Sequence, residues 1–116
     1  MTITNLTPHA INFQDETGGV TTFSPSGVVV RVNTETTSVD TLLMGKFPLQ
    51  FKKTLSLGNL PERKEGEIFL VSGMVLDAVQ KLGMKGFIAP ATGPDDGAIR
   101  NEKGHIVAVT KFDSAL

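Results

Sequence analysis

The chain contains no cysteine, no tryptophan and no tyrosine. The absence of cysteine excludes disulfide bonds, thiolate metal sites and a thiol nucleophile. Small cysteine-free domains fit a reducing compartment, so we expect a cytoplasmic protein. The seven phenylalanines are the only aromatic residues, which disfavours an extended stacking platform for single-stranded nucleic acid.

Runs of basic residues and long apolar runs are also missing. Eleven basic and twelve acidic residues are scattered along the sequence and give a formal net charge of −1. This distribution lacks the electrostatic footprint of a protein that binds duplex nucleic acid. The longest apolar runs are far shorter than the roughly 20 residues of a membrane-spanning helix. We therefore expect neither duplex nucleic acid nor a membrane as a partner, and no signal peptide or lipid anchor.

The 116 residues have the length of a single domain, and we expect one domain over residues 1–116. Two hairpins are predicted from turn chemistry. Ala10–Phe13 and Val20–Phe23 flank a turn that contains two glycines. Gly97–Arg100 and His105–Phe112 flank Asn101–Gly104, whose Asn and Gly positions match a type I turn with a glycine bulge.

The middle of the chain gives weaker signals. Val28–Val32 is rich in β-branched residues and is predicted to be a strand, as is Pro48–Leu55. Asn33–Thr41 is rich in threonine and short acids, and the sequence leaves open whether it is an exposed edge strand or a loop. Gly58–Gly66 is predicted to be a loop because glycines bracket it and its second half is polar.

One short helix is predicted over about 72–82. Ser72 is a suitable N-cap, and Gly83 is placed to adopt the left-handed closing conformation. The predicted apolar stripe consists of Val75, Leu76, Val79 and Leu82. The flanking strands, Glu67–Val71 and Gly86–Ala89, are candidates for parallel pairing through a helical crossover.

Together these elements predict an α+β domain. The sheet is expected to be mainly antiparallel and curled or partly closed, with the helix packed on it.

Two segments combine polar side chains with stiffening residues, and the first is Asn5–His9. Proline at position 8 holds Thr7 extended, and His9 is one of two histidines in the chain. An imidazole serves as acid, base or ligand near neutral pH. The alternative is that Thr7 and His9 only bond to nearby backbone where the chain leaves the strand.

The second segment is Ala89–Arg100. It holds Thr92, Gly93, Asp95-Asp96 and Arg100 between two prolines and two glycines. An arginine beside glycine-rich backbone amides suits a phosphate or carboxylate group. The alternative is a rigid turn in which Arg100 pairs with one of the aspartates. A calcium site is disfavoured because the loop lacks the six or more oxygen ligands that this ion takes, and neither a metal nor a cofactor is predicted.

Four motifs carry a resemblance to a known group of proteins. They are Asn5–His9, Gly58–Glu62, Leu70–Ser72 and the segment from Ala89 through Asn101. In this combination the chain resembles a family of small uncharacterised proteins of phages, prophages and bacteria. The resemblance covers most of the chain and implies a phage or mobile-element setting, but it supplies no activity and no catalytic residues.

Three functions are compatible with these features. The favoured one is a non-enzymatic protein that binds or sequesters a small anionic ligand such as a nucleotide, with a site formed by Thr7, His9, Thr92, Gly93, Asp95 and Arg100. The second is a protein–protein interaction module, such as an inhibitor of a host enzyme or a minor virion component. The third is a small hydrolase or isomerase that uses His9 with Asp95 or Asp96. Self-association of the chain remains open under each of them.

Overall fold

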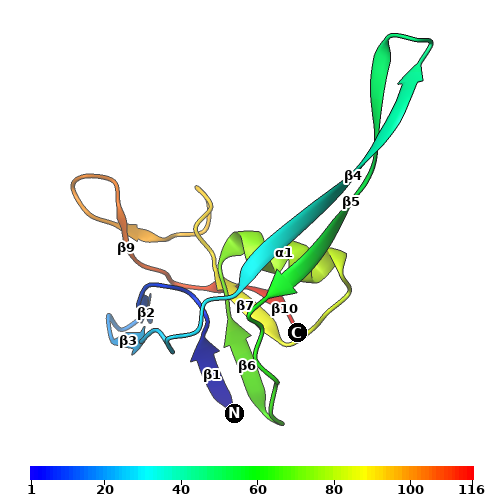
Figure 1. The fold of residues 1–116 in the computed structure, drawn as a ribbon. Helices are drawn as coiled ribbons and strands as arrows, with labels where there is room; N and C mark the ends of the chain where they lie inside the picture. The colour runs from blue at the N-terminus through cyan, green and yellow to red at the C-terminus, as the bar shows by residue number, and fades with distance from the viewer.

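The computed structural model describes the backbone of residues 1–116 and all side chains except those of residues 36–41, 48 and 50–54. Figure 1 shows a body with a short helix and several small sheets, from which a long two-stranded arm projects. The radius of gyration is 18.1 Å, whereas a compact chain of this length has about 13 Å. The arm accounts for this elongated shape.

The body is built on a four-stranded sheet with the order β1-β6-β7-β10. Its strands are β1 (Thr2–Asn5), β6 (Glu67–Leu70), β7 (Phe87–Pro90) and β10 (Phe112–Ala115). The first three are parallel, and β10 pairs antiparallel with β7. The predicted parallel pairing on either side of the helix is thereby confirmed.

Helix α1 (Gly73–Lys81) crosses from β6 to β7. The Ser72 hydroxyl accepts a hydrogen bond from the backbone N–H of Val75 at 3.3 Å, and Gly83 ends the helix with a φ of 71°. The buried side chains of the helix are those of Val75, Leu76, Ala78 and Val79. Leu82 was wrongly assigned to the buried stripe: it is the exposed C-cap residue, beyond the last turn that faces the sheet.

Two phenylalanines form the centre of the core. Phe69 and Phe87 are almost fully buried on adjacent strands, and their rings meet edge to face at 5.7 Å. The Arg63 guanidinium lies over both rings, 5.5 and 5.2 Å from their centroids, and donates to the carbonyl of Lys85. The predicted loop before β6 therefore closes one end of the core through a cation–π contact.

Both predicted hairpins are present. β2 (Ile11–Gln14) pairs with β3 (Val20–Phe23), and β8 (Ile99–Arg100) pairs with β9 (Ile106–Ala108). Gly104 has the positive φ that its turn requires, 81°. The single strand predicted over 105–112 was wrong, because the chain leaves the hairpin after β9 and Phe112 begins β10 at the edge of the central sheet.

The turn between β2 and β3 is organised by Asp15. Its carboxylate accepts hydrogen bonds from the Thr17 hydroxyl at 2.6 Å and from the backbone N–H groups of Thr17 and Gly19, both at 2.9 Å. The Thr17 hydroxyl, followed by the Gly19 amide, lowers the pKa of Asp15 below its usual value. The ionised carboxylate thus favours this turn at neutral pH, and the benefit is lost as the pH falls through the lowered pKa.

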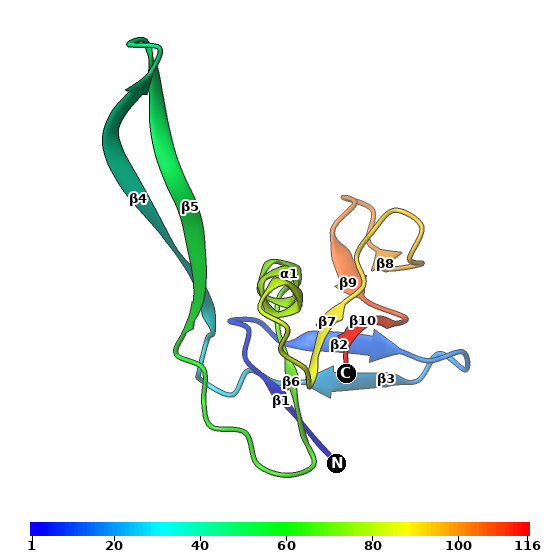
Figure 2. The same ribbon diagram turned by 90° about the vertical axis from the view of Figure 1, so that its right-hand side faces the viewer.

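The arm consists of β4 (Arg31–Leu43) and β5 (Phe47–Gly58), paired antiparallel with two shifts of register, between Thr36 and Ser38 and between Ser38 and Leu42. Asn33–Thr41 is therefore strand rather than loop. The strand predicted from Val28 begins only at Arg31, because the Val30 backbone N–H donates to the Leu6 carbonyl in the body instead of joining the arm. At about 3.3 Å per residue the arm is roughly 40 Å long, and Figure 2 shows it standing clear of the body.

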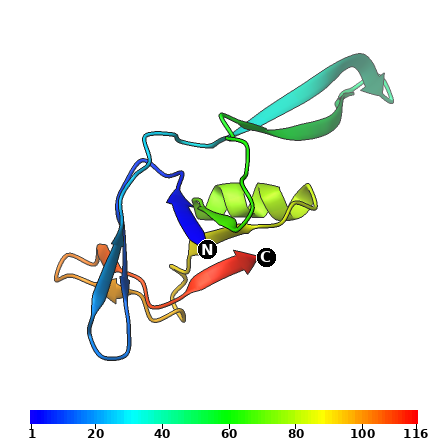
Figure 3. The same cartoon turned by 90° about the horizontal axis from the view of Figure 1, so that it is seen from below.

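The α+β class is confirmed, whereas the single curled or partly closed sheet is not. The strands fall into four separate sheets, none of them closed, and the three two-stranded sheets are antiparallel. Figure 3 shows the two short hairpins on the side of the body opposite the arm. Strand patterns specify turns and buried faces but not which sheet a strand joins, so the division into four sheets was not predictable from them.

The contact of α1 with the sheet can be tested by placing a charge in it. Val79 has no exposed surface, so Val79→Asp should lower the free energy of unfolding by about 4 kcal/mol or more, or prevent folding. Urea denaturation followed by circular dichroism measures this change. Gln80→Asp, the same new charge on the exposed side of the helix, should cost less than about 1 kcal/mol. Equal losses for the two variants would contradict the packing described.

Candidate functional site

A buried asparagine holds the end of β1 in place. Asn5 is 2% exposed, and its side-chain amide makes four hydrogen bonds. Its Nδ2 donates to the carbonyls of His9 at 2.9 Å and Phe23 at 2.8 Å. Its Oδ1 accepts from the backbone N–H of Thr7 at 2.9 Å and from the Thr7 hydroxyl at 2.7 Å. The amide thereby uses its full hydrogen-bonding capacity inside the protein.

These bonds fold the segment after β1 into a tight loop. The Thr7 hydroxyl lies 2.9 Å from the His9 carbonyl oxygen as well as 2.7 Å from Asn5 Oδ1. Thr7 is therefore engaged with the loop itself, as in the structural alternative for this segment. The side chain of His9 is exposed. The loop therefore fixes the position of His9, whereas the Thr7 hydroxyl is engaged in hydrogen bonding within the loop.

Three segments that are far apart in sequence converge beside this loop. A hollow of about 340 Å³ is lined by residues from the loop and β2, from the start of α1, and from the end of β7 and beyond it: Thr7, Pro8, His9, Ile11, Ser72, Gly73, Pro90 and Thr92. We call it the cleft. The structure thus brings together Thr7, His9 and Thr92, three of the residues of the predicted site.

The topology of the central sheet explains this convergence. β1, β6 and β7 run parallel, so the loops that follow Asn5, Leu70 and Pro90 leave the sheet at the same edge. In parallel α/β sheets ligands bind at this edge, outside the carboxyl ends of the strands. The cleft lies at that position.

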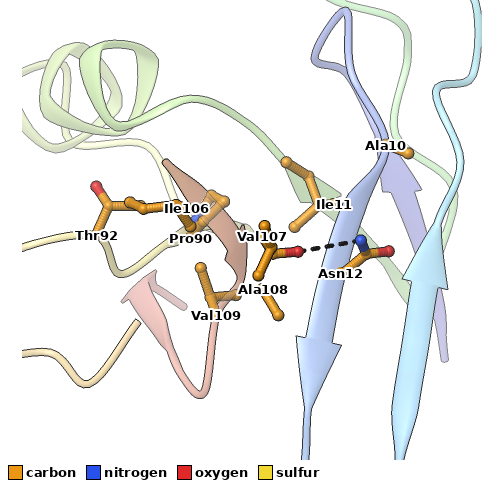
Figure 4. Close-up of a pocket in the computed structure, with 9 residues that line it drawn as sticks. All are labelled: Ala10, Ile11, Asn12, Pro90, Thr92, Ile106, Val107, Ala108 and Val109. Atoms are coloured by element: carbon orange, nitrogen blue, oxygen red, sulfur yellow. Dashed lines mark hydrogen bonds between the residues drawn. The ribbon is translucent and has the colours of Figure 1, made fainter. Parts of the chain in front are cut away.

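A second, smaller hollow of about 140 Å³ adjoins the cleft and shares Ile11, Pro90 and Thr92 with it. Figure 4 shows Pro90 and Thr92 on one side, Ile11 and Asn12 on the other, and Val107–Val109 between them. The Asn12 Nδ2 donates to the Val107 carbonyl at 3.2 Å and fixes the hairpin there. The cleft therefore extends as a groove towards the C-terminal hairpin.

Several hydrogen-bond donors lie at the cleft. The first hydrogen bond within α1 runs from the Leu76 N–H to the Ser72 carbonyl, so the N–H groups of Gly73 and Met74 precede the helix ladder. The hydroxyls of Ser72 and Thr92 and the imidazole of His9 complete the polar set. Among the described residues that line the cleft, none carries a carboxylate.

The remaining predicted site residues are placed elsewhere. The Gly93 N–H donates to Asp96 Oδ2 at 2.8 Å, which makes a rigid turn. Arg100 Nη1 donates to the Gly104 carbonyl at 3.0 Å within the C-terminal hairpin, rather than pairing with an aspartate. Asp95 is exposed. Gly93, Asp95 and Arg100 do not line the cleft, because the chain turns away after Thr92 into β8.

Sequence reasoning missed the central role of Asn5 and the contribution of Ser72 and Gly73 to the cleft. The spacing Asn5-x-Thr7 was an available signal, since an asparagine side chain commonly accepts from the N–H two residues on. Ser72 was predicted only as an N-cap. Its position at the cleft depends on the pairing of β6 with β1, which no local pattern specifies.

Over the described residues, no group of three or more histidine, aspartate and glutamate side chains is arranged to hold a metal ion. Nor does any helix in that part of the chain have the length and apolar character needed to traverse a bilayer.

The role of Asn5 can be tested with a near-isosteric change. In Asn5→Asp a carboxylate would face the carbonyls of His9 and Phe23 without a proton to donate, so the free energy of unfolding at pH 7 should fall by about 3 kcal/mol. The loss should shrink at acidic pH, where a protonated carboxyl regains one donor. Urea denaturation at the two pH values measures both effects. The control is Asn59→Asp, at an exposed position with one long hydrogen bond, which should change the free energy of unfolding by less than about 0.5 kcal/mol. Equal losses of stability in the two variants would contradict the role described for Asn5.

Comparisons with models of protein families, with curated proteins and with solved structures found no match to this chain. The roles of the cleft residues therefore rest on the geometry and chemistry described above.

Proposed function

We propose that this chain is a non-enzymatic binding protein that takes a small anionic ligand, such as a nucleotide, in the cleft. The observation that carries the proposal is the convergence of three loops at the carboxyl edge of β1, β6 and β7 around a hollow lined by hydrogen-bond donors and no described carboxylate. The loop from Thr7 to His9 and Thr92 belong to this site, with Ser72 and Gly73 added.

The size and walls of the cleft suit a ligand with a flat apolar part. Its volume of about 340 Å³ lies at the lower end of the range for small-molecule sites, roughly 300–1,000 Å³. Pro8, Ile11 and Pro90 supply apolar wall. A planar ring such as a nucleobase would bury its face against such a wall.

The other end of the cleft suits a negative charge. The N-terminus of α1 carries the positive end of the helix dipole and presents backbone donors. The Ser72 and Thr92 hydroxyls and the His9 imidazole add side-chain donors. A ligand that joins a ring to a phosphate or carboxylate would meet both environments together.

The enzyme alternative has less support. His9 is the one titratable side chain among the described residues of the cleft. The Asp96 carboxylate is occupied by the Gly93 N–H, and neither Asp95 nor Asp96 lines the cleft. An imidazole without a carboxylate to orient it lacks the arrangement proposed for a hydrolase or isomerase.

The resemblance to phage and prophage proteins extends the proposal to a biological role. In the cytoplasm of an infected bacterium, a protein that binds a nucleotide without converting it would lower the free concentration of that nucleotide. Sequestration of a host signalling nucleotide is the role that we propose.

The proposal can be tested by filling the cleft. A Cβ at Gly73 would meet no atom within 4 Å, and the φ of Gly73 is not positive, so Gly73→Leu should fold normally and project into the ligand volume. We expect adenosine 5′-monophosphate or another nucleotide of a screened panel to raise the melting temperature of the wild type. A ligand at a hundred times its dissociation constant adds about 2.7 kcal/mol of stability. Gly73→Leu should weaken binding at least about tenfold by calorimetry.

Matched variants give this experiment its controls. Gln80→Leu places the same side chain on the exposed side of α1, outside the cleft, and should bind as the wild type does. His9→Gln should weaken an anionic ligand more than the corresponding uncharged nucleoside. Arg100→Lys, outside the cleft, should leave binding unchanged. A panel without any stabilising nucleotide, or equal affinity of Gly73→Leu and wild type, would refute the proposal.

A further inference from the structure

The end of the arm exposes a cluster of large apolar side chains. We call it the tip, and it consists of Leu42, Leu43, Met44, Phe47 and Leu49. Met44 is 81% exposed and Phe47 is 55% exposed. Single exposed apolar residues are ordinary on a protein surface, but a contiguous cluster of them marks an interaction surface.

The backbone at the tip is also unusual. Lys46 N–H donates to the Leu43 carbonyl at 3.1 Å, which closes a turn whose two central residues, Met44 and Gly45, have φ values of 55° and 69°. Turns of this type favour asparagine or glycine at both central positions. A methionine there carries backbone strain and is exposed as well, two costs that a monomer does not need. Such strain points to a function for the side chain.

The arm has little support of its own. Near its base, Val32 and Leu57 pack against the core beside α1. Beyond the base it is a two-stranded sheet, so each strand has one edge without a neighbouring strand. Isolated two-stranded hairpins are marginally stable in water, and open edges favour pairing with another chain. An arm of this length therefore suits a protein that holds it against a partner.

The area of the tip matches a second copy of the same surface. Leu42 and Leu43 are successive strand residues and face opposite sides of the ribbon. With about 200 Å² for each fully exposed side chain, the tip without Leu42 offers on the order of 450 Å². Two tips facing each other would bury about 900 Å², which is the range of small, reversible interfaces. A two-fold contact satisfies both tips with one set of residues.

We propose that this protein forms a homodimer in which the arms of two copies pack against each other through their tips. A membrane surface is the less favoured occupant. Lipid binding by an apolar element usually draws on a cluster of basic side chains, and the turn at residues 44–46 contains a single lysine. The proposal does not rest on ligand binding, because the cleft shares no residue with the tip.

The first test is the mass of the protein in solution by sedimentation equilibrium. We expect a concentration-dependent species of twice the 12.4 kDa of one chain. Phe47→Glu should raise the dissociation constant at least about tenfold, since buried aromatic residues dominate interfaces. Val20→Glu makes a similarly drastic change at a residue of similar exposure, 57%, in the β2–β3 hairpin, and it should dimerise like the wild type.

A second variant separates association from folding. Met44→Gly relieves the strained φ and removes the largest exposed side chain of the turn. Its melting temperature, measured at a concentration where the wild type is monomeric, should be equal to or higher than that of the wild type. Its dissociation constant should nevertheless rise at least about threefold. Weaker association in a protein that folds as well or better cannot be attributed to misfolding.

The absence of native cysteine allows the contact to be located. A spin label on Lys46→Cys should report a separation between copies below about 30 Å if the tips meet, and a label on Lys103→Cys, at an exposed position in the C-terminal hairpin, should report a longer one. A wild type that stays monomeric at about 100 µM would overturn the proposal. So would a dimer unaffected by Phe47→Glu, or a monomer that binds neutral phosphatidylcholine vesicles through the tip.

Discussion

The site depends on one buried side-chain amide. Asn5 ends β1, and its four hydrogen bonds tie together the loop that contains Thr7 and His9 and the end of β3 at Phe23. Because the amide has both donors and acceptors, an aliphatic side chain or a carboxylate cannot replace it without leaving backbone groups unpaired. The Leu6 N–H then pairs with Leu70, and the Val30 N–H with Leu6. One polar group thus fixes the point where the central sheet, the β2–β3 hairpin and the chain leading to the arm meet.

Local chemistry accounts for the parts of the fold that were predictable. Ser72 and Gly83 mark the two ends of α1. A hydroxyl that accepts a hydrogen bond stabilises the N-terminus of a helix, and a residue free to adopt positive φ stabilises its C-terminus, wherever they occur in a fold. Gly104 marked its turn for the same local reason. Leu82 was misassigned because helical periodicity continues one residue beyond the last turn that contacts the sheet. The prediction of a single strand over residues 105–112 was also wrong. The end of this segment joins the free edge of β7 in the central sheet, and local sequence does not specify that pairing.

The same distinction applies to the candidate site, where some residues could be selected from sequence but their arrangement could not. The polar residues around Thr7, His9 and Thr92 could be selected from sequence because prolines and glycines mark loops that hold side chains in place. Their meeting point could not be derived, since it follows from the parallel order of β1, β6 and β7. Arg100 illustrates the limit: it is eight residues from Thr92 in sequence, yet the intervening turn and β8 carry it into a separate hairpin, where it bonds to Gly104. Distance along the chain was a poor guide to distance from the cleft.

Helix α1 links the two surfaces that the protein presents. Its first residues border the cleft, and its side contacts the base of the arm, where Met74 and Ala78 share a hollow with Val32 and Leu55. Helix α1 is thus in contact with the base of the arm along its side and with the cleft at its N-terminus. The hairpins that extend the cleft lie on the opposite side of the body from the arm (Figure 3). Two copies joined at their tips would therefore hold both clefts at the outer ends of the dimer, open to solvent, with the helix between each cleft and its arm.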